Sequence, residues 1–141
     1  MNDPTLSADR ACILLVDDND NVRTSISRVL AQAGHEVVEA GSGDDAAALI
    51  DDAAPFDLLV TDVRMPGSCD GVALATGWRE KVPGRPVLFV SGDTDGRLDM
   101  DALGPHEALL HKPFRRASLL DAVQHLLRND RHRKKSGTGA N

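Results

Sequence analysis

Five short apolar runs, four of them followed by a segment that favours a helix, constrain the fold of this chain more than any other feature. The first run, ACILLV, carries no polar alternation, which is typical of a strand covered by helices on both faces. The next segment has apolar residues at helical spacing and ends at Gly34, where a helix C-cap is expected. The same unit then recurs along the sequence. We expect strands at 11–16, 35–40, 56–62, 86–92 and 106–112, and helices at 22–33, 42–53, 70–81 and 115–128.

Strands that alternate with helices in this way are parallel and are joined by right-handed crossovers. The expected fold class is therefore α/β, a doubly wound five-stranded parallel sheet of the flavodoxin-like (βα)5 kind. The remaining helix of such a fold would lie in segment 93–105, which holds four Asp and two Gly. Because these residues form helices poorly, we expect this helix to be short or mobile.

The length of 141 residues fits one domain and leaves no room for a second. We expect a flexible N-terminus at 1–10, a folded domain at 11–128 and a basic, disordered tail at 129–141. The tail is rich in Gly, Ser and charge, as solvated chain ends are. The chain as a whole has a net charge of −6. Since contacts to phosphate backbones need clustered Lys and Arg, we expect no direct nucleic-acid binding.

Membrane association is not expected either. No apolar stretch approaches the roughly 20 residues that span a bilayer. The segment MNDPTLSADR lacks both the basic and the apolar region of a signal peptide. We therefore expect a cytoplasmic protein that makes no contact with a membrane.

Polar or charged residues end four of the five expected strands. Parallel strands point their carboxyl ends at one edge of the sheet, and ligands bind there beside the switch in strand order. The residues at these strand ends are therefore candidates for a single functional site. They are Asp17 and Asp18 on the first strand, Asp62 on the third, Ser91 on the fourth and Lys112 on the fifth.

Carboxylates crowded at one edge repel each other, by roughly 4 kcal/mol for two unit charges 4 Å apart at an effective dielectric constant near 20. The Lys112 ammonium supplies one compensating charge, and a divalent cation would supply the rest. Oxygen ligands without His or thiolate favour a hard ion, and room for water favours Mg²⁺ over Ca²⁺. A carboxylate beside these cations is a nucleophile toward phosphorus, and we expect Asp62 to take that role. Lys112 and the Ser91 hydroxyl would bind the phosphoryl oxygens.

Four segments of the sequence resemble the signatures of response-regulator receiver domains, namely LLVDDND, LLVTDVRMPGSCDG, VLFVSG and HKPF. The resemblance covers about residues 11–128. It implies that Asp62 is the phosphoacceptor, that Asp18 binds Mg²⁺ directly and that Asp17 binds it largely through water. The backbone carbonyl of Arg64 would complete the metal ligands.

The same resemblance implies a cis peptide bond between Lys112 and Pro113. It also implies a switch in which Ser91 moves toward the phosphoryl group. The family usually has an aromatic residue three positions before the lysine, which turns inward on activation, whereas this sequence has Leu109. A rotating aromatic side chain therefore cannot be the output signal in this chain.

Receiver domains are regulatory phosphoacceptors, so we expect the chain to catalyse only its own phosphorylation and dephosphorylation. The resemblance implies a sensor histidine kinase or a histidine phosphotransfer protein as the phosphodonor. A protein target of unknown identity would bind the face formed by segment 93–105, strand 106–112 and helix 115–128.

Three other functions are open to a chain with this pattern. The chain could be a phosphate shuttle or sink without an output of its own. It could be an aspartyl-phosphate phosphohydrolase, but such enzymes need a second Asp two residues after the nucleophile, and this sequence has Arg64 there. It could also be a flavin-binding module on the same fold, although acidic strand ends repel a flavin phosphate.

Overall fold

The computed structural model describes residues 10–51, 56–65, 67, 69–92, 103–104 and 106–139. The expected N-terminal segment 1–10 and the expected helix in 93–105 therefore lie almost entirely outside the described residues. The strands are β1 (Cys12–Val16), β2 (Glu36–Ala40), β3 (Leu58–Asp62), β4 (Val87–Ser91) and β5 (Glu107–His111). The helices are α2 (Asp20–Gln32), α3 (Gly43–Asp51), α4 (Gly71–Lys81) and α5 (Arg116–Gly139).

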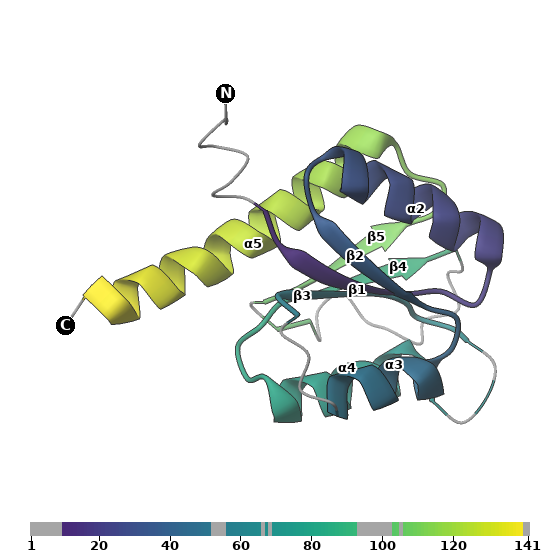
Figure 1. Cartoon of the computed structure of the whole chain (residues 1–141), viewed down its shortest axis with the longest axis horizontal. Helices are drawn as coiled ribbons and strands as arrows, with labels where there is room; N and C mark the ends of the chain where they lie inside the picture. The colour runs from purple at the N-terminus through teal and green to yellow at the C-terminus, as the bar shows by residue number, and fades with distance from the viewer. Residues whose placement is uncertain are drawn as a thin grey trace.

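The five strands form one parallel sheet in the order β2-β1-β3-β4-β5. The chain first moves outward from β1 to β2 and then continues on the other side of β1 with β3, so the strand order switches between β1 and β3. Figure 1 shows α2 and α5 over one face of the sheet and α3 and α4 over the other. The predicted doubly wound α/β fold is confirmed, and every strand lies inside its predicted range.

Alternate side chains of the central strands enter two separate cores. In β1, Leu14 and Val16 pack with residues of α3 and α4, whereas Ile13 and Leu15 pack with residues of α2 and α5. The apolar side chains of β3 and β4 divide in the same way. Because both faces of these strands are covered, their sequences carry no polar alternation.

Helix caps place the helices directly after the strand ends. The side chains of Asn19 and Asp70 each accept a hydrogen bond from the backbone amide three residues further on, at 3.0 and 2.9 Å. Ser42, which precedes α3, does the same at 3.1 Å. Gly34 follows α2 with a φ of 99°, a left-handed conformation that favours glycine, as predicted for a helix C-cap. The three N-terminal caps lie in the connections that follow β1, β2 and β3, at the carboxyl edge of the sheet.

The end of α5 differs from the prediction. We expected this helix to end near Arg128 and a disordered tail to follow, but the helix continues to Gly139. Arg and Lys are good helix formers, so the basic composition after Arg128 permits the helix to continue. In Figure 1 the last part of α5 projects away from the rest of the fold. None of the described helices is long and apolar enough to cross a membrane.

The start of α4 lies against the end of β3. The Gly71 amide donates a hydrogen bond to the Val63 carbonyl at 3.0 Å. A Cβ atom on Gly71 would lie only 2.0 Å from the backbone oxygen of Asp62. A side chain at this position would therefore push α4 away from the strand end that carries Asp62.

We predict that Gly71→Ala lowers the free energy of unfolding by about 2 kcal/mol or more, because the added methyl group overlaps backbone atoms that cannot move independently. Gly77, which lies in the same helix with open space around it, provides the control. Gly77→Ala should stabilise the protein by about 0.5–1 kcal/mol. Urea unfolding followed by circular dichroism measures both changes. A Gly71→Ala variant within about 0.5 kcal/mol of wild type would contradict the packing described above.

Candidate functional site

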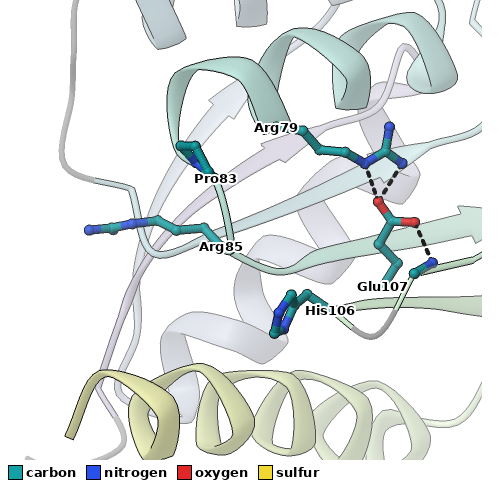
Figure 2. Close-up of a pocket in the computed structure, with 7 residues that line it drawn as sticks. Arg79, Pro83, Arg85, His106 and Glu107 are labelled. Carbon is teal, nitrogen blue, oxygen red and sulfur yellow. Dashed lines mark hydrogen bonds and ion pairs between the residues drawn. The ribbon is translucent and has the colours of Figure 1, made fainter. Parts of the chain in front are cut away.

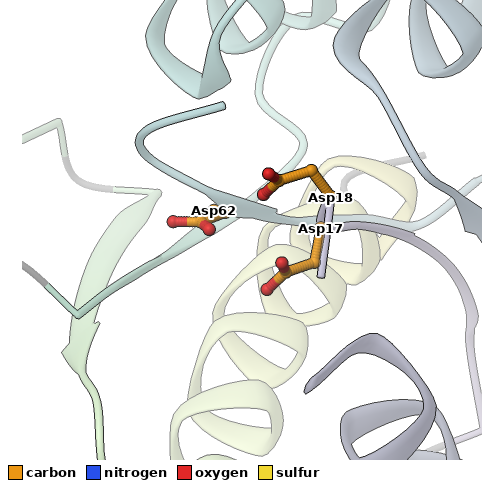
Figure 3. Close-up of side chains that lie close together, drawn as sticks. All are labelled: Asp17, Asp18 and Asp62. Atoms are coloured by element: carbon orange, nitrogen blue, oxygen red, sulfur yellow. The ribbon is translucent and has the colours of Figure 1, made fainter. Parts of the chain in front are cut away.

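Three carboxylates meet at the carboxyl edge of the sheet, at the switch in strand order. Asp17 and Asp18 directly follow β1, and Asp62 is the last residue of β3. One oxygen from each side chain lies within 4.8 Å of the others. Figure 3 shows the three side chains gathered at the ends of their strands. Asp17 is buried, Asp62 is half-buried and Asp18 is exposed, so the cluster is open to solvent on the Asp18 side.

Lys112 follows β5, an outer strand of the sheet, and its side chain brings a positive charge into this cluster. Its Nζ atom lies 3.2 Å from Oδ2 of Asp17 and 3.4 Å from Oδ2 of Asp62. The peptide bond between Lys112 and Pro113 is cis, as the sequence resemblance implies. The Lys112 amide donates a hydrogen bond to the Ser91 carbonyl at 2.7 Å, which ties the residue after β5 to the end of β4.

Gly92 leaves room for the lysine side chain to cross β4. A Cβ atom on Gly92 would lie 3.4 Å from Cδ of Lys112. The lysine stem therefore passes directly over this glycine on its way from β5 to the carboxylates at the ends of β1 and β3.

The charges of the site are unbalanced. Burial raises the pKa of Asp62 above its usual value, the Lys112 ammonium lowers it, and the neighbouring Asp17 raises it again. Three carboxylates facing one ammonium carry a formal charge of −2. A divalent cation would neutralise the cluster, and the three side chains could hold one.

The remaining predicted site residues lie at the same edge. Ser91 is buried as the last residue of β4, one position beyond Val90, which is paired with Asp62 in the sheet. Arg64 is exposed, and its backbone amide hydrogen-bonds to the Asp62 carboxylate. The structure thus brings both Asp17 and Asp62 into contact with Lys112, and Ser91 and Arg64 lie at the same edge of the sheet.

Two residues that contact the site were missed by the sequence analysis. The Asn19 amide donates a hydrogen bond to Oδ1 of Asp17 at 2.9 Å. Arg23 donates a hydrogen bond to the backbone carbonyl of Asp17 at 2.7 Å. Asn19 could have been identified as a helix N-cap from its place before α2. The contact of Arg23 has no local sequence signal, because it depends on how α2 packs beside the end of β1.

A pocket of about 430 Å³ lies at the opposite edge of the sheet, between the end of α4 and the start of β5. Figure 2 shows the ion pair between Arg79 and Glu107 on one side of it. Glu107 also accepts a hydrogen bond from the Gly104 amide at 2.9 Å, and Arg85 donates to the Phe56 carbonyl at 2.6 Å. Because these charged groups already bond to protein partners, the pocket is a poorer candidate than the carboxylate cluster.

Comparison with known proteins agrees with the geometry. The family model described as response regulator receiver domain matches residues 13–124. The response regulator receiver protein CpdR of Brucella abortus is 32% identical, with 82% of this chain and 95% of CpdR covered. The chain spans only about a quarter of two longer regulatory proteins that it also matches.

Two solved structures are similar in fold and in sequence. A response regulator receiver protein from Sinorhizobium medicae is 31% identical with a TM-score of 0.80, covering 87% of this chain and 98% of that one. The receiver domain of the hybrid histidine kinase CckA is 35% identical with a TM-score of 0.69, covering 82% and 98%. The chain therefore belongs to the response-regulator receiver-domain family and has the phosphoacceptor role of that family in two-component signalling.

Proposed function

We propose that Asp62 is the residue that accepts the phosphoryl group, and that Asp17, Asp18, Asp62 and the backbone carbonyl of Arg64 hold Mg²⁺. The observation that carries the proposal is the cluster of three carboxylate oxygens within 4.8 Å of one another, with the Lys112 ammonium against two of the side chains. Asp62 is the half-buried member of the cluster, and its Oδ2 atom lies 3.4 Å from the Lys112 ammonium.

The donor atoms fit Mg²⁺. The three side chains of the cluster offer only hard oxygen ligands. The exposed Asp18 leaves one side of the site open, which suits an ion that keeps several of its waters. When bound, Mg²⁺ supplies positive charge to the oxygens of the phosphoryl group during transfer.

Asp62 acts as the nucleophile in the proposed reaction. One of its carboxylate oxygens forms a bond to phosphorus while the bond between phosphorus and the donor's imidazole nitrogen breaks, and the imidazole keeps the electron pair. The product is an acyl phosphate on Asp62. The Lys112 ammonium pairs with one phosphoryl oxygen, and the Ser91 hydroxyl donates a hydrogen bond to another. Hydrolysis of the acyl phosphate by water releases inorganic phosphate and restores Asp62, so the chain catalyses only its own modification and recovery.

A sensor histidine kinase or a histidine phosphotransfer protein is the proposed donor, and we place this exchange in the cytoplasm. The resemblance to receiver domains, including that of a hybrid histidine kinase, supports this choice. A protein target would bind the face made by segment 93–105, β5 and α5. Leu109 is half-buried in β5 and packs against the core on the side of α3 and α4. The signal to that face therefore passes through changes in packing rather than through rotation of an aromatic ring.

We predict that Asp62→Asn abolishes labelling of the protein by acetyl phosphate in the presence of Mg²⁺, because the amide cannot attack phosphorus. Intact-protein mass spectrometry measures the gain of one phosphoryl group. Asp121→Asn is the control, since Asp121 is exposed on α5 and the substitution removes the same charge. Wild type and the control should be labelled, and chelation of the metal should prevent both reactions. Labelling of Asp62→Asn at the wild-type rate would refute the assignment.

Lys112 should also stabilise the metal-free fold. We predict that Lys112→Met lowers the free energy of unfolding by on the order of 2 kcal/mol without Mg²⁺, because the buried Asp17 loses its ion-pair partner. Millimolar Mg²⁺ should stabilise this variant more than wild type, since the cation then supplies the missing charge. Urea titrations with Mg²⁺ or with a chelator measure both effects. Equal stabilisation of variant and wild type by Mg²⁺ would show that lysine and metal do not compensate the same carboxylates.

A further inference from the structure

Arg23 links three structural elements next to the carboxylate cluster. Its Nη1 atom donates to the backbone carbonyl of Asp17 at 2.7 Å, and its Nη2 atom donates to Oδ1 of Asp20 at 2.7 Å. Its Nε atom donates to Oε1 of Glu39 on β2 at 3.1 Å. The side chain is only 16% exposed. One planar guanidinium thus joins the end of β1, the first turn of α2 and the neighbouring strand, a geometry that suits the rigid fork of arginine donors.

Arg23 is hydrogen-bonded to the peptide group that joins Asp17 to Asp18. The Asp17 amide donates to the Ala40 carbonyl at 3.2 Å, and the Asp17 carbonyl accepts from Arg23. Since a peptide group is planar, fixing this carbonyl also fixes the direction in which the chain enters Asp18.

Asp18 depends on this backbone support more than the other two acids do. Asp17 is held by the Asn19 amide and by Lys112, and Asp62 is held by Lys112. Within the part of the chain that the structure describes, the Asp18 side chain forms no hydrogen bond or ion pair. The orientation of its carboxylate toward the cluster is therefore set by the backbone that carries it.

We infer that Arg23 is a positioning residue for the metal site: by holding the Asp17–Asp18 peptide group, it aims the Asp18 carboxylate at the cation without touching the cation itself. This inference rests on the proposed metal site. Outer groups that orient a metal ligand in this way strongly affect affinity.

The charge of Arg23 would have the opposite effect if it acted only through space. A guanidinium near an acidic cluster repels a divalent cation, so its removal would strengthen Mg²⁺ binding. Positioning predicts that its removal weakens Mg²⁺ binding. The sign of the change therefore separates the two roles.

Calorimetric titration of the full chain with MgCl₂ tests the inference. Arg23→Met, which keeps an unbranched stem and removes the guanidinium donors, should lower the Mg²⁺ affinity about tenfold. Arg28→Met is the matched control, because Arg28 is exposed on the same helix and forms no hydrogen bond or ion pair with the described residues. Its Mg²⁺ affinity should stay within about twofold of wild type. Arg23→Lys cannot reach all three acceptors with one ammonium, so its affinity should fall by at least about twofold.

The dependence of acetyl phosphate labelling on Mg²⁺ gives a second measurement. For Arg23→Met, the Mg²⁺ concentration at half-maximal rate should rise, whereas the rate at saturating Mg²⁺ should stay near that of wild type. A general structural defect would instead lower the saturating rate.

Wild-type Mg²⁺ affinity in either folded Arg23 variant, or an equal loss in Arg28→Met, overturns the role of Arg23. If Arg23→Met does not fold, Arg23→Lys decides the question alone. Absence of Mg²⁺ binding by the wild-type chain would instead overturn the proposed metal site, so the two failures are distinguishable.

Discussion

The contact of one ammonium with two carboxylates from different strands is the interaction on which the site depends. Lys112 reaches from the end of β5 across β4 to Asp17 and Asp62, at the ends of β1 and β3. Its charge reduces the repulsion between the acids but leaves the cluster formally negative. The site therefore remains assembled without a metal and still attracts a divalent cation.

Charged groups are paired differently at the amino and carboxyl edges of the sheet. At the amino edge, Asp57 accepts a hydrogen bond from the Cys12 amide at 2.9 Å and pairs with Arg85 at 3.3 Å. The Arg85 carbonyl in turn accepts a hydrogen bond from the Trp78 ring at 3.2 Å. These groups satisfy one another and hold the start of β3 in place. At the carboxyl edge the acids outnumber the cation, which is the arrangement expected of a binding site rather than of a structural ion pair.

The sequence was sufficient to predict the strands and the gathering of Asp17, Asp18, Asp62 and Lys112 at one edge of the sheet, because four of the five strands end at a polar residue or are followed by one. It could not predict that Asp17 is buried while Asp18 is exposed, since the two are identical in type and adjacent in the chain. That difference arises from packing, because the Asp17 side chain turns inward to Lys112 and the Asn19 amide. The contact of Arg23 was missed for the same reason. The helix beyond Arg128 was missed because Gly, Ser and clustered charge were interpreted as disorder, although Arg and Lys permit a helix.

Anomalous diffraction from crystals grown with Mn²⁺, which binds oxygen ligands as Mg²⁺ does, tests the central claim most directly. The account predicts an anomalous peak between the carboxylates of Asp17, Asp18 and Asp62, with the Lys112 ammonium still beside Asp62. A peak at another place, or the three carboxylates bound to separate partners with no ion between them, would contradict it.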